Sequence, residues 1–145
     1  SFSWGDILLY SKTYNGIYII ENGELNEKIF INLYKEFNSK ICLEDFEINQ
    51  DGEIGILHCN GELTLFSQNG KKKITYPNLL NDAKFLVAIN FEWLCFDKNG
   101  NGRFVEKKAN NNLIVPATSI LDVTSNNRFI TVLTKDYILK MDVQK

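Results

Sequence analysis

Hydrophobic residues stand in short runs along this chain, and small polar turn residues separate the runs. The runs are rich in Ile, Val, Leu, Phe and Tyr, residue types that favour β-strands; examples are 17–20, 54–57 and 129–133. Asn-Gly and Asp-Gly pairs supply the positive φ angles that tight hairpin turns require. Such pairs begin at Asn15, Asn22, Asp51, Asn60, Asn69, Asn99 and Asn101. This pattern predicts an all-β chain built of short antiparallel hairpins.

An internal repeat accompanies the hairpin pattern. Segment 60–70 aligns with segment 90–100 without a gap. The identical residues are Asn60/Asn90, Glu62/Glu92, Phe66/Phe96, Asn69/Asn99 and Gly70/Gly100. Weaker copies run over 128–141 and 6–20. The hairpin turns of the four copies lie near residues 15, 60, 90 and 135, so that the repeat averages about 40 residues.

This arrangement resembles β-propeller repeats as a class, in which blades of about four strands recur about every 40 residues. The WD40 marks are missing, because Trp93 precedes Leu94 and His58 precedes Cys59. The resemblance implies a partial or small propeller in one all-β domain. Its units would cover about residues 1–41, 42–81, 82–112 and 113–145. A β-sandwich or barrel of short strands is the alternative.

The two ends of the repeat pattern are incomplete. The chain begins with what matches the second strand of a unit and stops after the third strand of another. Open sheet edges are templates for pairing with another chain, so self-association through these edges is expected. Within the repeat, Trp93 is expected to pack between two units.

Segment 27–37 departs from the strand pattern. Its apolar residues recur at helical spacing: Ile29, Phe30, Leu33, Tyr34 and Phe37. Asn26 would cap such a helix, whereas Ile29 and Ile31 also fit an edge strand. A strand or loop is the preferred interpretation here, because the first unit would otherwise lack its outer strand.

Composition and charge narrow the function classes. The chain has 145 residues with 16 Lys+Arg and 18 Asp+Glu, which gives a net charge of −2. A net charge this close to zero gives no electrostatic field strong enough to recruit nucleic acid. The longest apolar runs are too short to span a bilayer, so no membrane insertion is expected. No signal-peptide pattern opens the sequence.

The three cysteines, Cys42, Cys59 and Cys95, form no CxxC pair and lie in apolar runs. All three are predicted to be free, buried side chains, although one disulfide with one free thiol remains the alternative. An odd, unpaired-looking set and the missing signal pattern favour a cytoplasmic location.

The sequence offers little material for catalysis. His58 is the only histidine and is expected to lie half-buried in a strand, on the face opposite Leu57. The segment Asp97–Asn101 resembles the start of a calcium-binding loop. Counted from Asp97, however, the twelfth position is Lys108, where an EF-hand loop requires glutamate. The predictions are therefore no catalytic residue, no metal site and no cofactor.

Recognition of another protein is the remaining function. Amphipathic aromatics and polar turns are typical of interfaces. The candidate partner-binding residues are Trp4, Tyr14, Tyr18, Asn111 and Asn126. The predicted function is a non-catalytic protein-interaction module, on its own or within a larger propeller scaffold. A small immunity protein that blocks a toxin enzyme is one alternative, and a carbohydrate-binding β-repeat module is another.

Overall fold

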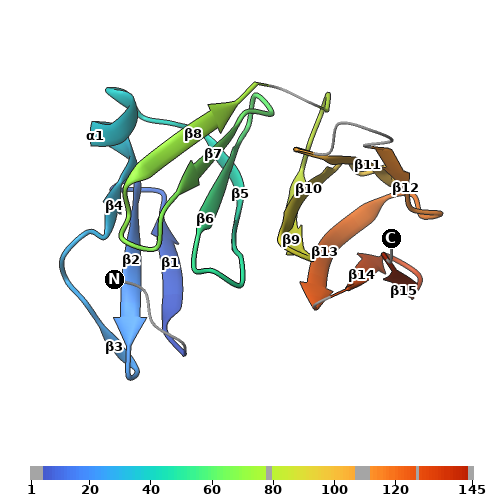
Figure 1. The fold of residues 1–145 in the computed structure, drawn as a ribbon, viewed down its shortest axis with the longest axis horizontal. Helices are drawn as coiled ribbons and strands as arrows, with labels where there is room; N and C mark the ends of the chain where they lie inside the picture. Colours follow the sequence, from blue (N-terminus) through green and yellow to red (C-terminus); the bar gives the residue numbers. More distant parts are fainter. Residues whose placement is uncertain (1–4, 78–79, 107–111, 127, 144–145) are drawn as a thin grey trace.

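Four antiparallel sheets follow one another along the chain in a computed structural model that describes residues 5–77, 80–106, 112–126 and 128–143. They form an arc, with the N-terminal sheet at one end and the C-terminal sheet at the other (Figure 1). Sheet 1 contains β1 (Ile7–Ser11), β2 (Gly16–Glu21), β3 (Glu24–Leu25) and β4 (Ile31–Asn32). Sheet 2 contains β5 (Leu43–Ile48), β6 (Ile54–His58), β7 (Leu63–Phe66) and β8 (Lys72–Tyr76).

The C-terminal half of the arc is built in the same way. Sheet 3 contains β9 (Phe85–Ile89), β10 (Glu92–Phe96), β11 (Asn101–Phe104) and β12 (Asn112–Ile114). Sheet 4 contains β13 (Ile120–Asn126), β14 (Phe129–Thr134) and β15 (Ile138–Asp142). The prediction of an all-β, propeller-like chain of four hairpin units is confirmed.

Among the described residues, the two end sheets each lack one position of the pattern of sheets 2 and 3; in sheet 1, β3 and β4 both pair with β2 and so occupy a single position. The β6–β7 turn lies beside the start of β5, where the Cys59 amide donates to the Cys42 carbonyl. The β1–β2 turn lies at the same place, because the side chain of Asn15 pairs with the backbone of Ile41. β1 and β2 therefore match β6 and β7. Among the described residues, sheet 1 lacks a counterpart of β5 and sheet 4 lacks a counterpart of β8.

The structure corrects the phase of the repeat. Segment 60–70 contains β7, the third strand of its sheet, whereas segment 90–100 contains β10, the second strand of its sheet. The turn equivalent to Asn60-Gly61 is the one at Asn99-Gly100, between β10 and β11. The alignment was wrong by one strand because successive hairpins of a sheet use the same Asn-based turn chemistry, and identity at the turns does not distinguish them.

The core lies between the sheets as three separate clusters, one at each junction. The cluster between sheets 1 and 2 contains Ile17, Ile31, Leu33, Ile54, Ile56 and Phe66. The cluster between sheets 2 and 3 contains Leu57, Leu63, Leu65, Ala83, Leu86, Trp93 and Cys95. The third cluster joins sheets 3 and 4 around Phe96, Ile120, Ile130 and Val132. Trp93 therefore packs between two units, as predicted.

Segment 27–37 contains both a strand and a helix, so the preference for strand or loop alone was wrong. β4 pairs with β2, and the five-residue helix α1 (Leu33–Phe37) follows at once. Asn32, and not Asn26, caps the helix, since its side chain accepts a hydrogen bond from the Lys35 amide. The helix places Leu33 in the core and Phe37 against the ring of His58.

Two of the three cysteines depart from the prediction. Cys42 and Cys59 form a disulfide and lie at the surface, although both stand in apolar runs. The hairpin register brings them together, because Leu43 pairs with His58 immediately inside them. Only Cys95 is a free, buried thiol, and burial raises its pKa to about 12. The inference of a reducing, cytoplasmic compartment from unpaired cysteines therefore loses its basis, because two of the three cysteines are paired.

Replacing Trp93 by Ala tests the packing between sheets 2 and 3. Trp93 is 3% exposed and its ring lies over Gly55, so the variant leaves a cavity and should lose roughly 3–5 kcal/mol of unfolding free energy in urea. Replacing the exposed Tyr34 of α1 by Ala is the control and should cost far less. A loss below about 1 kcal/mol for Trp93→Ala would contradict the packing.

Opening the Cys42–Cys59 disulfide tests the link at the start of sheet 2. The bridge closes a 17-residue separation, so the double variant Cys42→Ser/Cys59→Ser should lose about 2–3 kcal/mol of stability, mainly through a freer unfolded chain. A reducing agent should destabilise the wild type in urea unfolding and leave the double variant unchanged. Equal stability of the two proteins under oxidising conditions would show that the bridge contributes nothing.

Candidate interaction surface

Turns from sheets 2, 3 and 4 lie along one edge of the arc, its lower edge in Figure 1. The strands β5, β9 and β13 run in the same direction, which brings the turns that follow them to this one edge. The Leu86 amide of β9 donates to Asp45 of β5, and the Ser125 hydroxyl of β13 donates to the Ala88 carbonyl. We call this edge the lower rim and define it by Asn49, Asp51, Phe91, Asn126 and Arg128.

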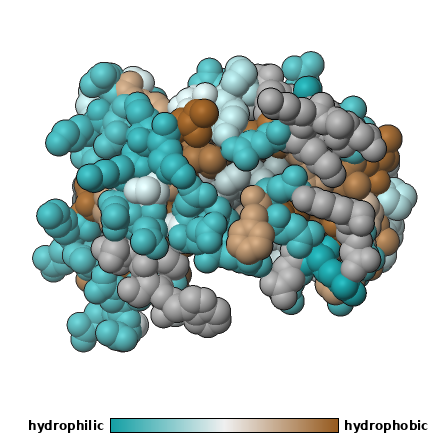
Figure 2. Space-filling view, viewed as in Figure 1, coloured by the Kyte–Doolittle hydropathy of each residue, from teal (hydrophilic) through white to brown (hydrophobic). Residues whose placement is uncertain are grey.

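Phe91 stands at the tip of the β9–β10 turn. The register pairs Ile89 with Glu92, so Asn90 and Phe91 form a two-residue turn with φ angles of 49° and 62°. Glycine normally takes the second position of such a turn, because a side chain there crowds the backbone. Phe91 is nevertheless 67% exposed. Figure 2 shows moderately hydrophobic atoms among hydrophilic ones near the middle of this face of the molecule.

Hydrogen bonds to neighbouring elements hold the rim turns in place. The Asn90 amide group donates to the Val143 carbonyl at 3.4 Å and so ties the β9–β10 turn to the end of sheet 4. In the β5–β6 turn, Oδ1 of Asn49 accepts from the amides of Asp51 and Glu53. Side-chain hydrogen bonds therefore hold the β5–β6 and β9–β10 turns of the lower rim.

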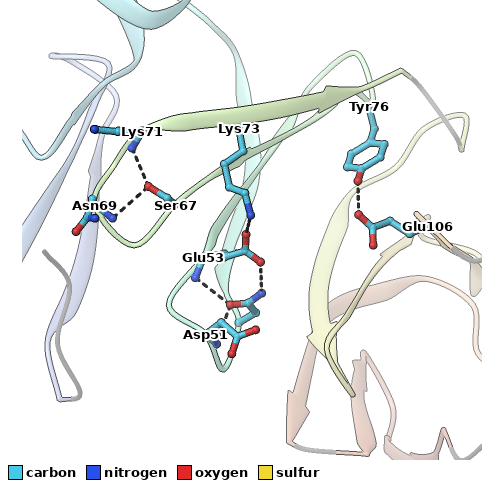
Figure 3. Close-up of polar contacts among 9 residues, drawn as sticks. Asp51, Glu53, Ser67, Asn69, Lys71, Lys73, Tyr76 and Glu106 are labelled. Atoms are coloured by element: carbon cyan, nitrogen blue, oxygen red, sulfur yellow. Dashed lines mark hydrogen bonds and ion pairs between the residues drawn. The ribbon is translucent and has the colours of Figure 1, made fainter.

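Charged pairs reinforce sheet 2 behind the rim (Figure 3). Lys73 of β8 donates to the carboxylate of Glu53, which also accepts from Nδ2 of Asn49 at 3.0 Å. The hydrogen bond from Lys73 lowers the pKa of Glu53. The contact is largely exposed, so it orients the turn more than it stabilises the fold.

Tyr76 and Glu106 join the outer edges of sheets 2 and 3. The Tyr76 hydroxyl donates to the Glu106 carboxylate (Figure 3). Burial, with this hydrogen bond, raises the pKa of Tyr76 to about 12. In the β7–β8 turn, at the opposite end of β8 from this bridge, Ser67 accepts from the amides of Asn69 and Lys71 and shapes the turn (Figure 3).

Asp45 links sheets 2 and 3 close to the axis of the arc. Its carboxylate accepts hydrogen bonds from the amides of Leu86 and Phe46, at 2.9 and 2.8 Å. Burial raises its pKa to about 6, and the neighbouring charges of Asp122 and Glu44 act in the same direction. The pKa of Glu47 is also raised, again mainly by burial. Asp45 thus joins adjacent sheets, whereas the Glu47 carboxylate accepts from the Ile48 amide of its own strand, and both carboxylates lie within electrostatic reach of Asp122.

His58 lies in β6 as expected, but it is buried and not half-buried. Its Nε2 lies 2.9 Å from the Thr64 hydroxyl, which in turn lies 3.0 Å from the Thr75 hydroxyl. The ring meets Phe37 edge-on at 5.0 Å. Burial lowers the pKa of His58, so the neutral form predominates at neutral pH.

The predicted partner-binding residues that the structure describes lie in two different sheets, Tyr14 and Tyr18 in sheet 1 and Asn126 in sheet 4. Trp4 and Asn111 lie outside the described residues. Tyr14 is exposed in the β1–β2 turn, and Tyr18 lies in the middle of β2. Asn126 is exposed at the end of β13, in the sheet at the other end of the arc, and lies on the lower rim.

Sequence reasoning missed Phe91, although a signal was present. The aligned pair Asn60-Gly61 and Asn90-Phe91 places phenylalanine where the turn chemistry calls for glycine. A bulky side chain in place of glycine at an exposed turn marks a residue that folding does not require.

The remaining surface offers two hollows at sheet junctions and no metal cluster in the described part of the chain. One hollow, of about 370 Å³, is lined by Tyr10, Lys12, Lys40, Ile41, Cys42 and Leu43. The other, of about 420 Å³, is lined by Glu44, Lys84, Phe85, Lys98, Ser119, Ile120 and Leu121. In the second hollow, the Lys84 ammonium and the Glu44 carboxylate form an ion pair at 3.6 Å.

Comparison with solved structures defines the fold. The chain superposes over its whole length on 49% of the WD40 β-propeller domain of Doa1, with a TM-score of 0.62 and 20% identity. It also matches BBS1N, solved in complex with ARL6DN, at a TM-score of 0.60 and 15% identity, with 93% of this chain and 42% of that one covered. The extracellular domain of BT4673 from B. thetaiotaomicron gives a TM-score of 0.64 at 11% identity, over 99% of this chain and 21% of that chain.

The fold is a β-propeller. The four sheets are its blades, and the chain spans about half the length of the Doa1 propeller domain. No protein-family model matches the sequence, and no curated protein matches it. In the described part of the chain, no helix is long and apolar enough to cross a membrane.

The raised pKa of Asp45 predicts a pH dependence of stability. The ordinary pKa of 3.8 applies to the unfolded chain, so between about pH 4 and pH 6 the folded state binds more protons and stability falls as pH rises. Asp45→Asn should reduce this fall by roughly 1–2 kcal/mol in urea unfolding measured at about pH 4.5 and pH 7.5. The exposed Asp82→Asn is the control. An unchanged fall in Asp45→Asn would show that another group titrates.

Proposed function

We propose that this propeller chain is a non-catalytic protein-interaction module and that it binds another protein through the lower rim, with Phe91 at the centre of the contact. The observation that carries the proposal is an exposed phenylalanine in a left-handed turn position. Such a position costs a non-glycine residue about 1–2 kcal/mol. Folding gains nothing in return, because most of the side chain lies in solvent.

The surroundings of Phe91 suit a protein partner. Aromatic side chains provide much of the binding energy at interfaces and are surrounded by polar residues that exclude water. On the rim, Asp51, Asn126 and Arg128 are exposed polar residues of this kind. The hydrogen bond of Asn90 to Val143 holds the turn, which reduces the entropy lost on binding. BBS1N, a structural neighbour, was solved with a protein partner.

Phe91→Gly tests the proposal because stability and binding should respond differently. Glycine removes the strain in the turn, so unfolding free energy should stay the same or rise slightly. The loss of the aromatic ring should weaken binding of the partner at least tenfold, equivalent to about 1.4 kcal/mol. The partner is recovered from lysate on the immobilised wild-type chain, purified, and titrated against each variant by calorimetry.

Tyr34→Ala is the matched control, because Tyr34 is a similarly exposed aromatic residue on α1, away from the lower rim. This variant should bind the purified partner with wild-type affinity. Equal affinity of wild type and Phe91→Gly would overturn the proposal. Retention of the wild-type chain on a glycan array without any protein partner would also overturn it.

A further inference from the structure

The Asn-Gly pairs that form turns in this chain also carry a chemical reactivity. In each pair an amide side chain is followed by glycine, which has no Cβ atom to keep its backbone nitrogen away from the asparagine side-chain carbonyl. Six such pairs occur, and all of them lie among the described residues. For this nitrogen to attack, the pair has to leave its turn conformation, which requires local opening. The surroundings of each pair therefore decide whether it reacts.

Three pairs are held by hydrogen bonds. Asn15 is 2% exposed, and its side-chain amide both donates to and accepts from the backbone of Ile41. In Asn60-Gly61 and Asn69-Gly70, the glycine amide donates to the carbonyl of the third residue before it, at 2.9 and 2.8 Å. The attacking nitrogen of both turns is thus engaged, and the side chain of Asn15 is fixed.

Tight packing restrains the two pairs that end at Gly100 and Gly102. A Cβ atom at Gly100 would lie 2.2 Å from the Val115 carbonyl oxygen, and one at Gly102 would lie 2.4 Å from the Phe96 ring. Val115 and Phe96 are both buried in the core between sheets 3 and 4. Neither glycine has room to rotate toward the preceding asparagine side chain without displacing these neighbours.

Asn22-Gly23 is free of both restraints. It forms the two-residue turn between β2 and β3, at the lower end of sheet 1 in Figure 1, with φ angles of 52° and 81°. All residues from 21 to 28 are exposed, and a Cβ atom at Gly23 would meet nothing within 4 Å. Neither the Asn22 side chain nor the Gly23 amide has a hydrogen-bond partner among the described residues. Because β3 has only two residues, this hairpin end opens more easily than the other turns.

We propose that Asn22-Gly23 is a site of spontaneous deamidation and that the carboxylate it produces loosens the β2–β3 hairpin. The Gly23 backbone nitrogen loses its proton and bonds to Cγ of Asn22, while Nδ2 leaves as ammonia. Water then adds to either carbonyl of the resulting cyclic imide, which opens to aspartate or to isoaspartate. Overall, water is consumed and ammonia is released, with no oxidation or reduction. Both products carry a negative charge where asparagine was neutral.

The new charge lies beside two glutamates that already face each other. Glu21 and Glu24 are cross-strand partners at the end of the hairpin, and like charges at such positions destabilise strand pairing. Isoaspartate also lengthens the turn backbone, which disturbs the register that a two-residue turn fixes. The next hydrogen bond along the hairpin runs from the Asn26 amide to the Ile19 carbonyl at 3.0 Å, so it should weaken first. The reaction takes place in sheet 1, whereas the lower rim belongs to sheets 2, 3 and 4, so it is independent of the proposed function.

Ageing of the whole folded chain at mildly alkaline pH in heavy-oxygen water, followed by peptide mapping with mass spectrometry, tests the site. Heavy oxygen marks the conversion that occurs during ageing and not during digestion. Asn22 should convert at least tenfold faster than Asn15, because only its turn opens readily. In urea the six pairs should convert at similar rates, since the fold no longer distinguishes them. Conversion of Asn22 in the folded chain no faster than that of Asn15, or slower than that of any other pair, would overturn the proposal.

Asn22→Asp tests the consequence for the hairpin, since aspartate suits the same turn and differs from asparagine in charge. Hydrogen exchange of the Asn26 amide should be several-fold faster in this variant than in the wild type, and the difference should shrink at high salt. Asn60→Asp is the matched control, because it adds the same charge to an Asn-Gly turn of sheet 2 and should leave this exchange unchanged. Wild-type exchange of the Asn26 amide in Asn22→Asp would overturn the loosening of the hairpin.

Discussion

Face-to-face stacking of small sheets is the constraint on which the rest of this structure depends. A sheet of three or four short strands has two faces, and sheets 2 and 3 each bury apolar side chains on both, so each of them packs between two neighbours. The junction of sheets 2 and 3 shows how close the approach is. A Cβ atom at Gly55 would lie 2.8 Å from the ring of Trp93, so glycine at this position lets the indole pack against β6.

The junction of sheets 1 and 2 is made differently, because sheet 1 lacks a counterpart of β5 among the described residues. Asn15 supplies part of the missing contact, since its side chain donates to and accepts from the backbone of Ile41 as a neighbouring strand would. Helix α1 brings Leu33 and Phe37 onto the same face of sheet 2. The Cys42–Cys59 bridge then fastens the connection between the sheets to the β6–β7 turn. The Asn15 hydrogen bonds, helix α1 and the disulfide thus take the place of a first strand in sheet 1.

The strands could be predicted from the sequence because turn chemistry and apolar alternation are local signals. The order in which hairpins belong to blades is not local, which explains why segment 60–70 was matched to the wrong strand of sheet 3. The disulfide could not be predicted for the same reason, because only the pairing of Leu43 with His58 brings Cys42 beside Cys59. Asn32 was missed as a cap because one residue ends β4 and begins α1.

The residues proposed for recognition lie where stacking imposes no demand. A side chain such as Trp93 is constrained by two sheets at once, whereas the rim turns touch only their own sheet or the next strand end. Substitution at a turn changes little of the core, so a residue that costs stability persists there only if it serves something other than folding. Phe91 meets this condition, and the Asn90 contact to Val143 limits its cost by holding the turn. In the proposed function, the stacked sheets hold the rim turns in position, and a partner binds at these turns without disturbing the core.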